Sequence, residues 1–391
     1  MPMRGSFKSE VLDNGVLLLV DTYPSSLASI AIGIRVGPLY EREEERGYSH
    51  LLEHAMFNVP GFDVDRAVES LGGETNAYTH RDLVVLTFQA LAESFEGLAE
   101  AALRVLTNRS YEEDRFEREK RVVLSEIRTK REDPGERIGD LGLRALFGEG
   151  AWGAPIEGYP EVVGAASVRD IVEFEERWIR PNRLIVAATG GVGRSGVERL
   201  RAMLSALEGE APEGDPPPMA KGPGHVEELD ESISGIYYSY AVKVTTRQPY
   251  LKLNAAAFHL ASGTKSLLFR ELRERGLAYS YYVDFDSMGD EGFLQVVVES
   301  ANDLEGVRRV VKRLLHSPED VPEYRLRYFE YDWNKNMENP LSRAYAYVEA
   351  VNKGIDPANL EQLVRGAVAE GVEPLAFSVE YAAEAVLRPR P

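Results

Sequence analysis

Apolar positions along this 391-residue chain follow two periods, the alternation typical of strands and the three-to-four-residue repeat typical of helices. The run VLLLV at residues 16–20 and the alternating ASIAIGIRVG at residues 28–37 predict two strands, joined by the turn-rich DTYPSS. A helical pattern follows at residues 48–56 and ends near Pro60. The chain therefore begins as strands accompanied by helices.

The same mixture continues through the first half of the chain. The pattern predicts a helix at 64–71, a strand at 74–89, helices at 92–105 and 111–130, a buried strand at 182–189 and a helix at 197–207. The stretch PEGDPPPMAKGPG at residues 212–224 can form neither helix nor strand comfortably, so we place a linker there. This divides the chain into domains at 1–211 and 225–391.

The second domain shows the same mixture of predicted strands and helices as the first, which favours a duplicated unit. We predict strands at 236–244 and 281–286, helices at 253–260 and 304–315, and then helices to the end. The expected fold class is α+β, built from α/β layers. It comprises two similar domains, each a mostly antiparallel sheet flanked by helices.

Composition narrows the classes of function. The 45 Lys and Arg against 64 Asp and Glu give a net charge of −19, which would repel nucleic acid and would favour basic peptides as ligands. With no cysteine and six histidines, any metal site must use His, Asp or Glu. Residues 1–10 lack an apolar run of signal-peptide length and other apolar runs are strand-sized, so we expect a cytoplasmic protein without membrane contact.

One short segment carries metal chemistry. Residues 50–54 read HLLEH, and on a helix His50 and His54 lie one turn apart on one face, the separation that two ligands of one metal ion need. Glu53 lies beside them and can accept a proton from a water that the metal polarises. The alternative is a solvated polar helix face, but the neighbouring Leu51 and Leu52 indicate burial, where unpaired polar groups are costly.

The long charged helix offers a third ligand. In FEREKRVVLSEIRTK, at residues 116–130, Glu119 and Glu126 are seven residues apart and share a face with Val123. A carboxylate on a partly apolar face needs a cation or a donor. Taken alone, a helix this rich in charge is usually a solvated face. Together with His50 and His54, it is better interpreted as part of a metal site.

These residues resemble those of the pitrilysin/insulinase family of zinc metallopeptidases, in the half-length type of the mitochondrial processing peptidase subunits. Four segments spread over most of the chain carry the resemblance: GYSHLLEHAMF at 47–57, GGETNAYT at 72–79, EREKRVVLSEI at 117–127 and FRELRERGLAYS at 269–280. HxxEH is the order of the inverzincins. The resemblance implies that His50, His54 and Glu126 bind one zinc ion per chain, that Glu53 is the general base, and that Glu119 supports a ligand.

The resemblance also implies where a peptide lies. In the family, the strand that contains NAxT pairs with the substrate backbone, which places residues 74–79, and Asn76 and Ala77 in particular, along the peptide. From the residues alone, an edge strand whose Asn and Thr cap a turn explains the same segment.

A second substrate motif is expected in the second half of the chain. The family uses an Arg and a Tyr there to hold the substrate and the tetrahedral intermediate, and these correspond to Tyr279 and to Arg273 or Arg270. The family's usual spacing is seven residues, whereas Arg273 precedes Tyr279 by six, so the choice of Arg stays open.

We therefore expect a zinc-dependent endopeptidase that cleaves short or unfolded peptides. The alternative is a non-catalytic peptide-binding or scaffold subunit of the same fold that acts with a partner chain. A metallohydrolase of another fold that reuses HxxEH is a third interpretation. Because the chain has the length of one half of the long family members and carries both motifs, the resemblance implies a homodimer whose sites are completed in trans, with a heterodimer as the other arrangement.

Overall fold

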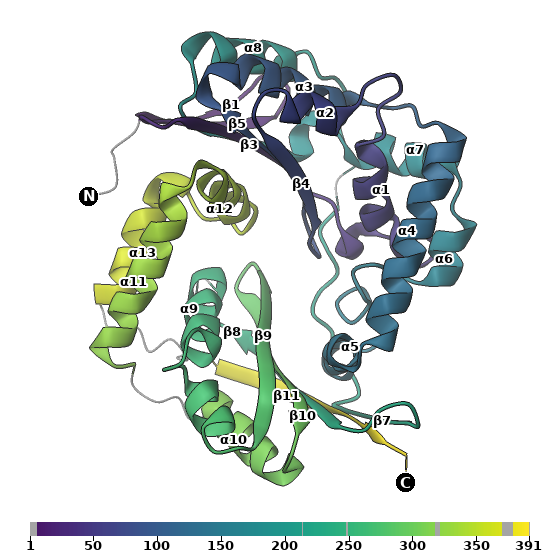
Figure 1. Ribbon diagram of the computed structural model, residues 1–391, viewed down its shortest axis with the longest axis vertical. Helices are drawn as coiled ribbons and strands as arrows, with labels where there is room; N and C mark the ends of the chain where they lie inside the picture. The colour runs from purple at the N-terminus through teal and green to yellow at the C-terminus, as the bar shows by residue number, and fades with distance from the viewer. Residues whose placement is uncertain (1–5, 213, 248, 317–320, 370–377, 391) are drawn as a thin grey trace. The chain divides into compact units, whose positions relative to one another are not determined.

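The computed structural model describes residues 6–212, 214–247, 249–316, 321–369 and 378–390 (Figure 1). The chain divides into two compact units. Unit 1 comprises Met1–Ile127, Pro155–Pro217 and Trp333–Ala358, and unit 2 comprises Arg128–Ala154, Pro218–Asp332 and Asn359–Pro391. The boundary after Pro217 falls in the predicted linker. However, residues 128–154 belong to unit 2 although they precede the linker, and residues 333–358 belong to unit 1 although they follow it.

Unit 1 is built on a six-stranded mixed sheet in the order β1-β2-β6-β3-β5-β4. Its strands are β1 Ser6–Val11, β2 Leu17–Thr22, β3 Leu27–Ile34, β4 Glu74–Thr79, β5 Val84–Leu91 and β6 Leu184–Gly190. Only β2 and β6 pair in parallel. The single strand predicted at 74–89 is wrong, because this segment is the hairpin of β4 and β5.

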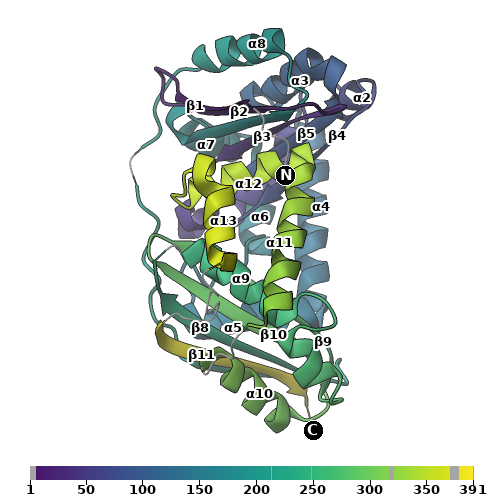
Figure 2. The same cartoon turned by 90° about the vertical axis from the view of Figure 1, so that its left-hand side faces the viewer.

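Helices cover both faces of this sheet (Figure 2). The helices of unit 1 are α1 Tyr48–Met56, α2 Val64–Glu69, α3 Phe95–Thr107, α4 Glu113–Glu132, α6 Pro160–Ala165, α7 Val168–Trp178, α8 Arg194–Ser205 and α12 Pro340–Asn352, with the last turn of α4 assigned to unit 2. Ile30 and Ile32 of β3 point into the core shared with α3 and α8. On the other face α12 packs so closely that a Cβ at Gly33 would come within 2.3 Å of Val348.

Buried charged groups join α12 to the sheet of unit 1. Asp21 of β2 accepts hydrogen bonds from Nη1 of Arg343 at 3.0 Å and from the hydroxyl of Tyr347 at 2.9 Å. All three side chains are buried, so the pairing satisfies groups that would be costly to leave alone. This contact explains why residues 333–358 belong to unit 1.

Unit 2 is built on a five-stranded mixed sheet in the order β7-β11-β8-β10-β9. Its strands are β7 His225–Asp230, β8 Ile236–Thr245, β9 Ala278–Met288, β10 Glu291–Ala301 and β11 Ser378–Pro389. Only β7 and β11 pair in parallel. The expectation of helices to the end of the chain is wrong, because β11 lies inside the sheet between β7 and β8.

The helices of unit 2 also lie on both faces of their sheet. They are α5 Pro134–Phe147, α9 Pro249–Ala261, α10 Leu304–His316, α11 Glu323–Glu338 and α13 Leu360–Ala369, with the end of α11 assigned to unit 1. Val296 and Val298 of β10 pack with α9 and α10 in one core, while Val297 packs with Ile138 of α5 in another. Since side chains alternate along a strand, α5 covers the opposite face from α9 and α10.

The two sheets share one topology. The run β2-β6-β3-β5-β4 in unit 1 and the run β7-β11-β8-β10-β9 in unit 2 have the same order of parallel and antiparallel neighbours. The prediction of two similar sheet-plus-helix domains is confirmed. Among the described residues, no helix is both long and apolar enough to span a bilayer.

Candidate metal centre

The N-terminus of α1 is fixed by a buried carboxylate. Glu41 accepts hydrogen bonds from the backbone N–H groups of Gly47 at 2.9 Å and Ser49 at 2.7 Å, which would otherwise lack partners at a helix start. Gly47 has φ 101°, a conformation that favours glycine. Burial raises the pKa of Glu41 to about 7, although both backbone hydrogen bonds oppose this rise. These contacts set the position of α1.

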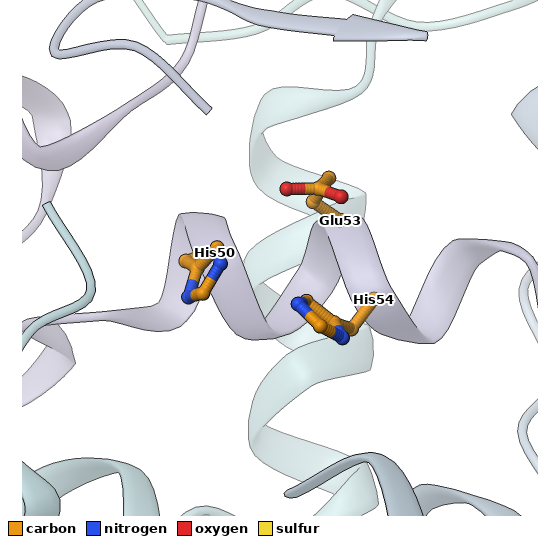
Figure 3. A group of neighbouring side chains, drawn as sticks. All are labelled: His50, Glu53 and His54. Atoms are coloured by element: carbon orange, nitrogen blue, oxygen red, sulfur yellow. The ribbon is translucent and has the colours of Figure 1, made fainter. Parts of the chain in front are cut away.

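The sequence of α1 divides it into an apolar and a polar face. Leu51, Leu52, Ala55 and Met56 are buried in the core of unit 1. The side chains of His50, Glu53 and His54 project from the rest of the helix, with the two imidazoles one turn apart (Figure 3). Their ring centroids are 4.8 Å apart. The predicted helix at 48–56 and its pair of histidines are thus present as expected.

Glu126 of α4 reaches both imidazoles. Its Oε2 atom lies 3.6 Å from Nε2 of His50 and 3.5 Å from Nε2 of His54. These separations are longer than ordinary hydrogen bonds. They are close to the spacing of about 3.3–3.4 Å between ligand atoms that tetrahedral bonds of about 2.0–2.1 Å to a zinc ion would give. Each distance is therefore compatible with Glu126 binding the same ion as the histidine it faces.

Glu119 lies on the other side of His54. Its Oε2 atom is 3.6 Å from Nδ1 of His54, while Nε2 of the same ring faces Glu126. A carboxylate at the outer nitrogen of a metal-binding imidazole selects the tautomer and orients the ring. The side chain of Glu119 is 29% exposed and that of Glu126 is 43% exposed. Glu126 therefore lies beside Nε2 of both histidines, whereas Glu119 lies beside the other ring nitrogen of His54.

Glu53 occupies a position between the histidines and the strand β4. One side-chain oxygen or nitrogen from each of His50, Glu53 and His54 lies within 4.8 Å of the others. Oε2 of Glu53 accepts a hydrogen bond of 3.0 Å from the hydroxyl of Thr79. Burial raises the pKa of Glu53, and the neighbouring His54 and the Thr79 hydroxyl act in the opposite direction. A carboxylate with a raised pKa is a better proton acceptor near neutral pH.

The predicted substrate strand is an edge strand. β4 is the last strand in its sheet and pairs with β5. Asn76 and Tyr78 are exposed, whereas Ala77 is half-buried and its N–H is bonded to Oδ1 of Asn76 at 2.8 Å. An edge strand offers backbone groups to an added strand, so this geometry suits an extended peptide.

The Arg and Tyr predicted from the second half lie together in unit 2. The guanidinium carbon of Arg273 is 4.8 Å from the centre of the Tyr279 ring, in a cation–π arrangement. Arg273 closes a π-helical turn at Phe269–Arg273, and Tyr279 is 71% exposed at the start of β9. Arg270 belongs to the same turn. This proximity favours Arg273 over Arg270 as the neighbour of Tyr279.

Two contacts of this region escaped the sequence analysis. The hydrogen bond from Thr79 to Glu53 could not be predicted from the sequence around Thr79, apart from its place in NAYT, because the two residues are 26 positions apart. Nε2 of His80 is hydrogen-bonded to the hydroxyl of Tyr345 on α12. The side chain of His80 is half-buried.

Comparisons with known proteins concern the family and the fold of the chain. The family model described as Insulinase (Peptidase family M16) matches residues 16–158, and the model described as Peptidase M16 inactive domain matches residues 165–322. A relative called an uncharacterized zinc protease, from Mycobacterium leprae, is 28% identical over 298 residues, which cover 73% of this chain and 67% of the relative.

Two further relatives extend the comparison. Cytochrome b-c1 complex subunit 1, mitochondrial, of Rattus norvegicus is 28% identical over 186 residues, 46% of this chain and 39% of that protein. The crystal structure of a protease from Helicobacter pylori matches the fold with a TM-score of 0.86 at 18% identity, covering 98% of this chain and 100% of that one.

The two histidines and the glutamate of α1 stand in the HxxEH order of the inverzincins, on a duplicated α+β framework. Two models of one family match successive parts of the chain. The chain belongs to the M16 (insulinase) peptidase family, as its sequence resemblance predicted. The interpretation as a metallohydrolase of another fold is thereby excluded.

Proposed function

We propose that the protein is a zinc-dependent endopeptidase that cleaves short or unfolded peptides. The observation that carries this proposal is the placement of one oxygen of Glu126 at 3.6 and 3.5 Å from Nε2 of His50 and His54, with Glu53 alongside. Relatives named zinc proteases support the choice of metal. One ion per chain would be held by His50, His54 and Glu126, with Glu119 orienting His54.

The proposed chemistry divides between the metal and the protein. When bound, zinc supplies Lewis-acid polarisation of the scissile carbonyl and makes a nearby water acidic, with a pKa of about 7. Glu53 accepts the proton of the attacking water and returns it to the leaving amine. The raised pKa of Glu53 suits both transfers.

The proposed substrate contacts come from a strand and from the Arg–Tyr pair. The edge of β4, with Asn76 and Ala77, pairs with the peptide backbone and tolerates varied side chains. Tyr279 and Arg273 stabilise the negative charge that develops on the carbonyl oxygen. The net charge of −19 favours basic peptides.

Assembly and location are part of the same proposal. The chain acts as a homodimer in which Tyr279 and Arg273 of one copy complete the zinc site of the other, or as a heterodimer with a related chain, in the cytoplasm. A fully active monomer at micromolar concentration, measured by light scattering and by activity at the same concentration, contradicts completion in trans.

A second function is favoured by one relative, whose name describes a subunit of the cytochrome b-c1 complex. In that case the chain would bind peptides or a partner chain without cleaving them. The two functions differ in whether zinc-loaded protein turns over substrate.

The test is hydrolysis of an unstructured basic peptide library by the purified chain, with zinc and after chelation, followed by mass spectrometry. Glu53→Gln should lower kcat by at least about 100-fold while zinc and peptide still bind. Glu69→Gln, which neutralises an exposed carboxylate at the end of α2, is the matched control. Bound zinc without cleavage by the wild type would favour the binding-subunit function, and cleavage by Glu53→Gln would overturn the role of Glu53.

A further inference from the structure

Thr79 connects the predicted substrate strand to the predicted base. It is the last residue of β4, and Thr75, Ala77 and Thr79 form the half-buried side of that strand. Strand alternation therefore turns Thr79 away from the exposed side that carries Tyr78. Its hydroxyl donates to Oε2 of Glu53 on α1 at 3.0 Å.

The turn after Thr79 is held from a distant part of the chain. His80, the next residue, is hydrogen-bonded through Nε2 to the hydroxyl of Tyr345 on α12. Asp82 in the same turn accepts hydrogen bonds from Asn352 at 2.9 Å and Lys353 at 2.8 Å. The end of β4 is thus attached to α12 on both sides of the turn, which restricts where the Thr79 hydroxyl can lie.

We infer that Thr79 is a positioning residue, which holds Oε2 of Glu53 so that the other carboxylate oxygen faces the reacting water, and that Tyr345 acts through His80 to keep Thr79 in place. This inference rests on the proposed function. A carboxylate without such a partner rotates about its terminal torsion, since that torsion has broad energy wells. Proton transfer requires hydrogen-bond distance to the transferred proton, so rotation lowers kcat rather than substrate affinity.

The hydrogen bond between Thr79 and Glu53 also links peptide binding at β4 to the orientation of the base, Glu53. A peptide that pairs with β4 adds hydrogen bonds to the strand on which Thr79 lies. Ordering of this edge would then order the Thr79 hydroxyl, and with it Glu53, when substrate is present. The strand that recognises the peptide backbone and the group that aligns the base are therefore one element.

The experiment measures kcat and KM of Thr79→Val on an unstructured peptide, with bound zinc determined by atomic absorption. Valine keeps the shape of the side chain and removes the hydroxyl. We expect kcat to fall about 10- to 100-fold, with KM and zinc content within twofold of the wild type. Thr79→Ser, which restores a hydroxyl, should recover most of kcat.

The control is Thr87→Val in the same hairpin. Its hydroxyl donates to the carbonyl of Asn76 at 3.0 Å and does not contact Glu53. We expect kcat of this variant to stay within twofold of the wild type. In a second series, Tyr345→Phe should lower kcat less than Thr79→Val does, and it should add no further loss in the double variant, because both act through the same group.

The outcomes separate this inference from the proposed function. No zinc-dependent cleavage by the wild type overturns the proposed function and the inference with it. If the wild type cleaves, an unchanged kcat in Thr79→Val, an equal loss in Thr87→Val, or a change confined to KM or zinc content overturns the inference alone. Loss of kcat in Thr79→Val with rescue by Thr79→Ser supports it.

Discussion

Corresponding helices of the two units differ sharply in chemistry. α1 follows β3 in unit 1, and α9 follows β8 in unit 2, at equivalent places in the shared topology. On α1, His50 and His54 face carboxylates. On α9, His259 is 3% exposed and packs against Phe258 and Phe329, and no described residue forms a hydrogen bond with its Nδ1 atom.

The residues that face these two helices from the helices packed against them carry opposite charges. α4 faces α1 with Glu119 and Glu126, whereas α11 faces α9 with Arg325. Nη2 of Arg325 donates to the carbonyls of Phe258 and Ser262 at the C-terminus of α9, at 3.1 and 2.9 Å. One framework thus supports a site suited to a cation in unit 1 and a neutral histidine beside a cation in unit 2. On the same topology, the two pairs differ in the residues of α1 and α9 themselves and in the charge that faces them from the second helix.

The largest expected effect comes from giving unit 1 the charge of unit 2. Glu126→Arg removes one proposed ligand and places a cation beside His50 and His54, so zinc affinity and peptidase activity should each fall by more than about 100-fold. Isothermal titration calorimetry with zinc and a peptide assay check this. Glu132→Arg, at an exposed position of the same helix, should behave as wild type. Zinc binding retained in Glu126→Arg would remove Glu126 from the site.

The next effect concerns acid stability and the buried histidine. Burial, with a contribution from Arg325, lowers the pKa of His259 from 6.5 to about 4. Between pH 6.5 and 4 the unfolded chain binds a proton that the folded chain does not, so the free energy of unfolding falls as pH drops, by up to about 3 kcal/mol. His259→Leu should lose this part of the pH dependence, measured by urea unfolding at pH 7 and 4.5.

A half-exposed histidine serves as the control for that measurement. The unfolding free energy of His225→Leu is measured at the same two pH values, and its change between them is compared with that of His259→Leu. If His259→Leu and the wild type lose the same free energy of unfolding between pH 7 and 4.5, the buried His259 is not the source of the pH dependence.

The smallest effect concerns Arg325. Arg325→Met keeps the aliphatic packing and removes the hydrogen bonds to the end of α9, which should lower the free energy of unfolding by about 1.5 kcal/mol. Zinc content should not change, because Arg325 and the proposed zinc ligands belong to different units. Chemical denaturation and atomic absorption measure the two quantities. A loss of zinc would show that the two helix pairs are not independent.

Local sequence predicted much of the candidate site. HxxEH, its helix at 48–56 and the seven-residue spacing of Glu119 and Glu126 all depend on periodicity within single helices. The turn at residues 80–83 was missed because it lacks Gly, Pro and Asn. The residues that hold it are Tyr345 and Asn352 of α12 and Lys353, which follows that helix. Contacts of such sequence separation leave no local signal.

The C-terminal strand shows the same limit. β11 reads SVEYAAEAVLRP, whose alanines disfavour a strand and suggest a helix. Pairing with β7 on one side and β8 on the other overrides this preference. The sequence also did not predict that α5 belongs to unit 2 and α12 to unit 1. This assignment depends on which sheet each amphipathic helix covers.

The placement of α12 has a consequence for synthesis on the ribosome. The strands of unit 1 are complete at residue 190, yet α12, which covers one face and neutralises Asp21, ends at residue 352. At a synthesis rate of about 5–20 residues per second, α12 is completed on the order of 10 s after the last strand of the sheet. During translation that face stays open to water and to chaperones, and a nascent chain arrested at the linker would display it permanently.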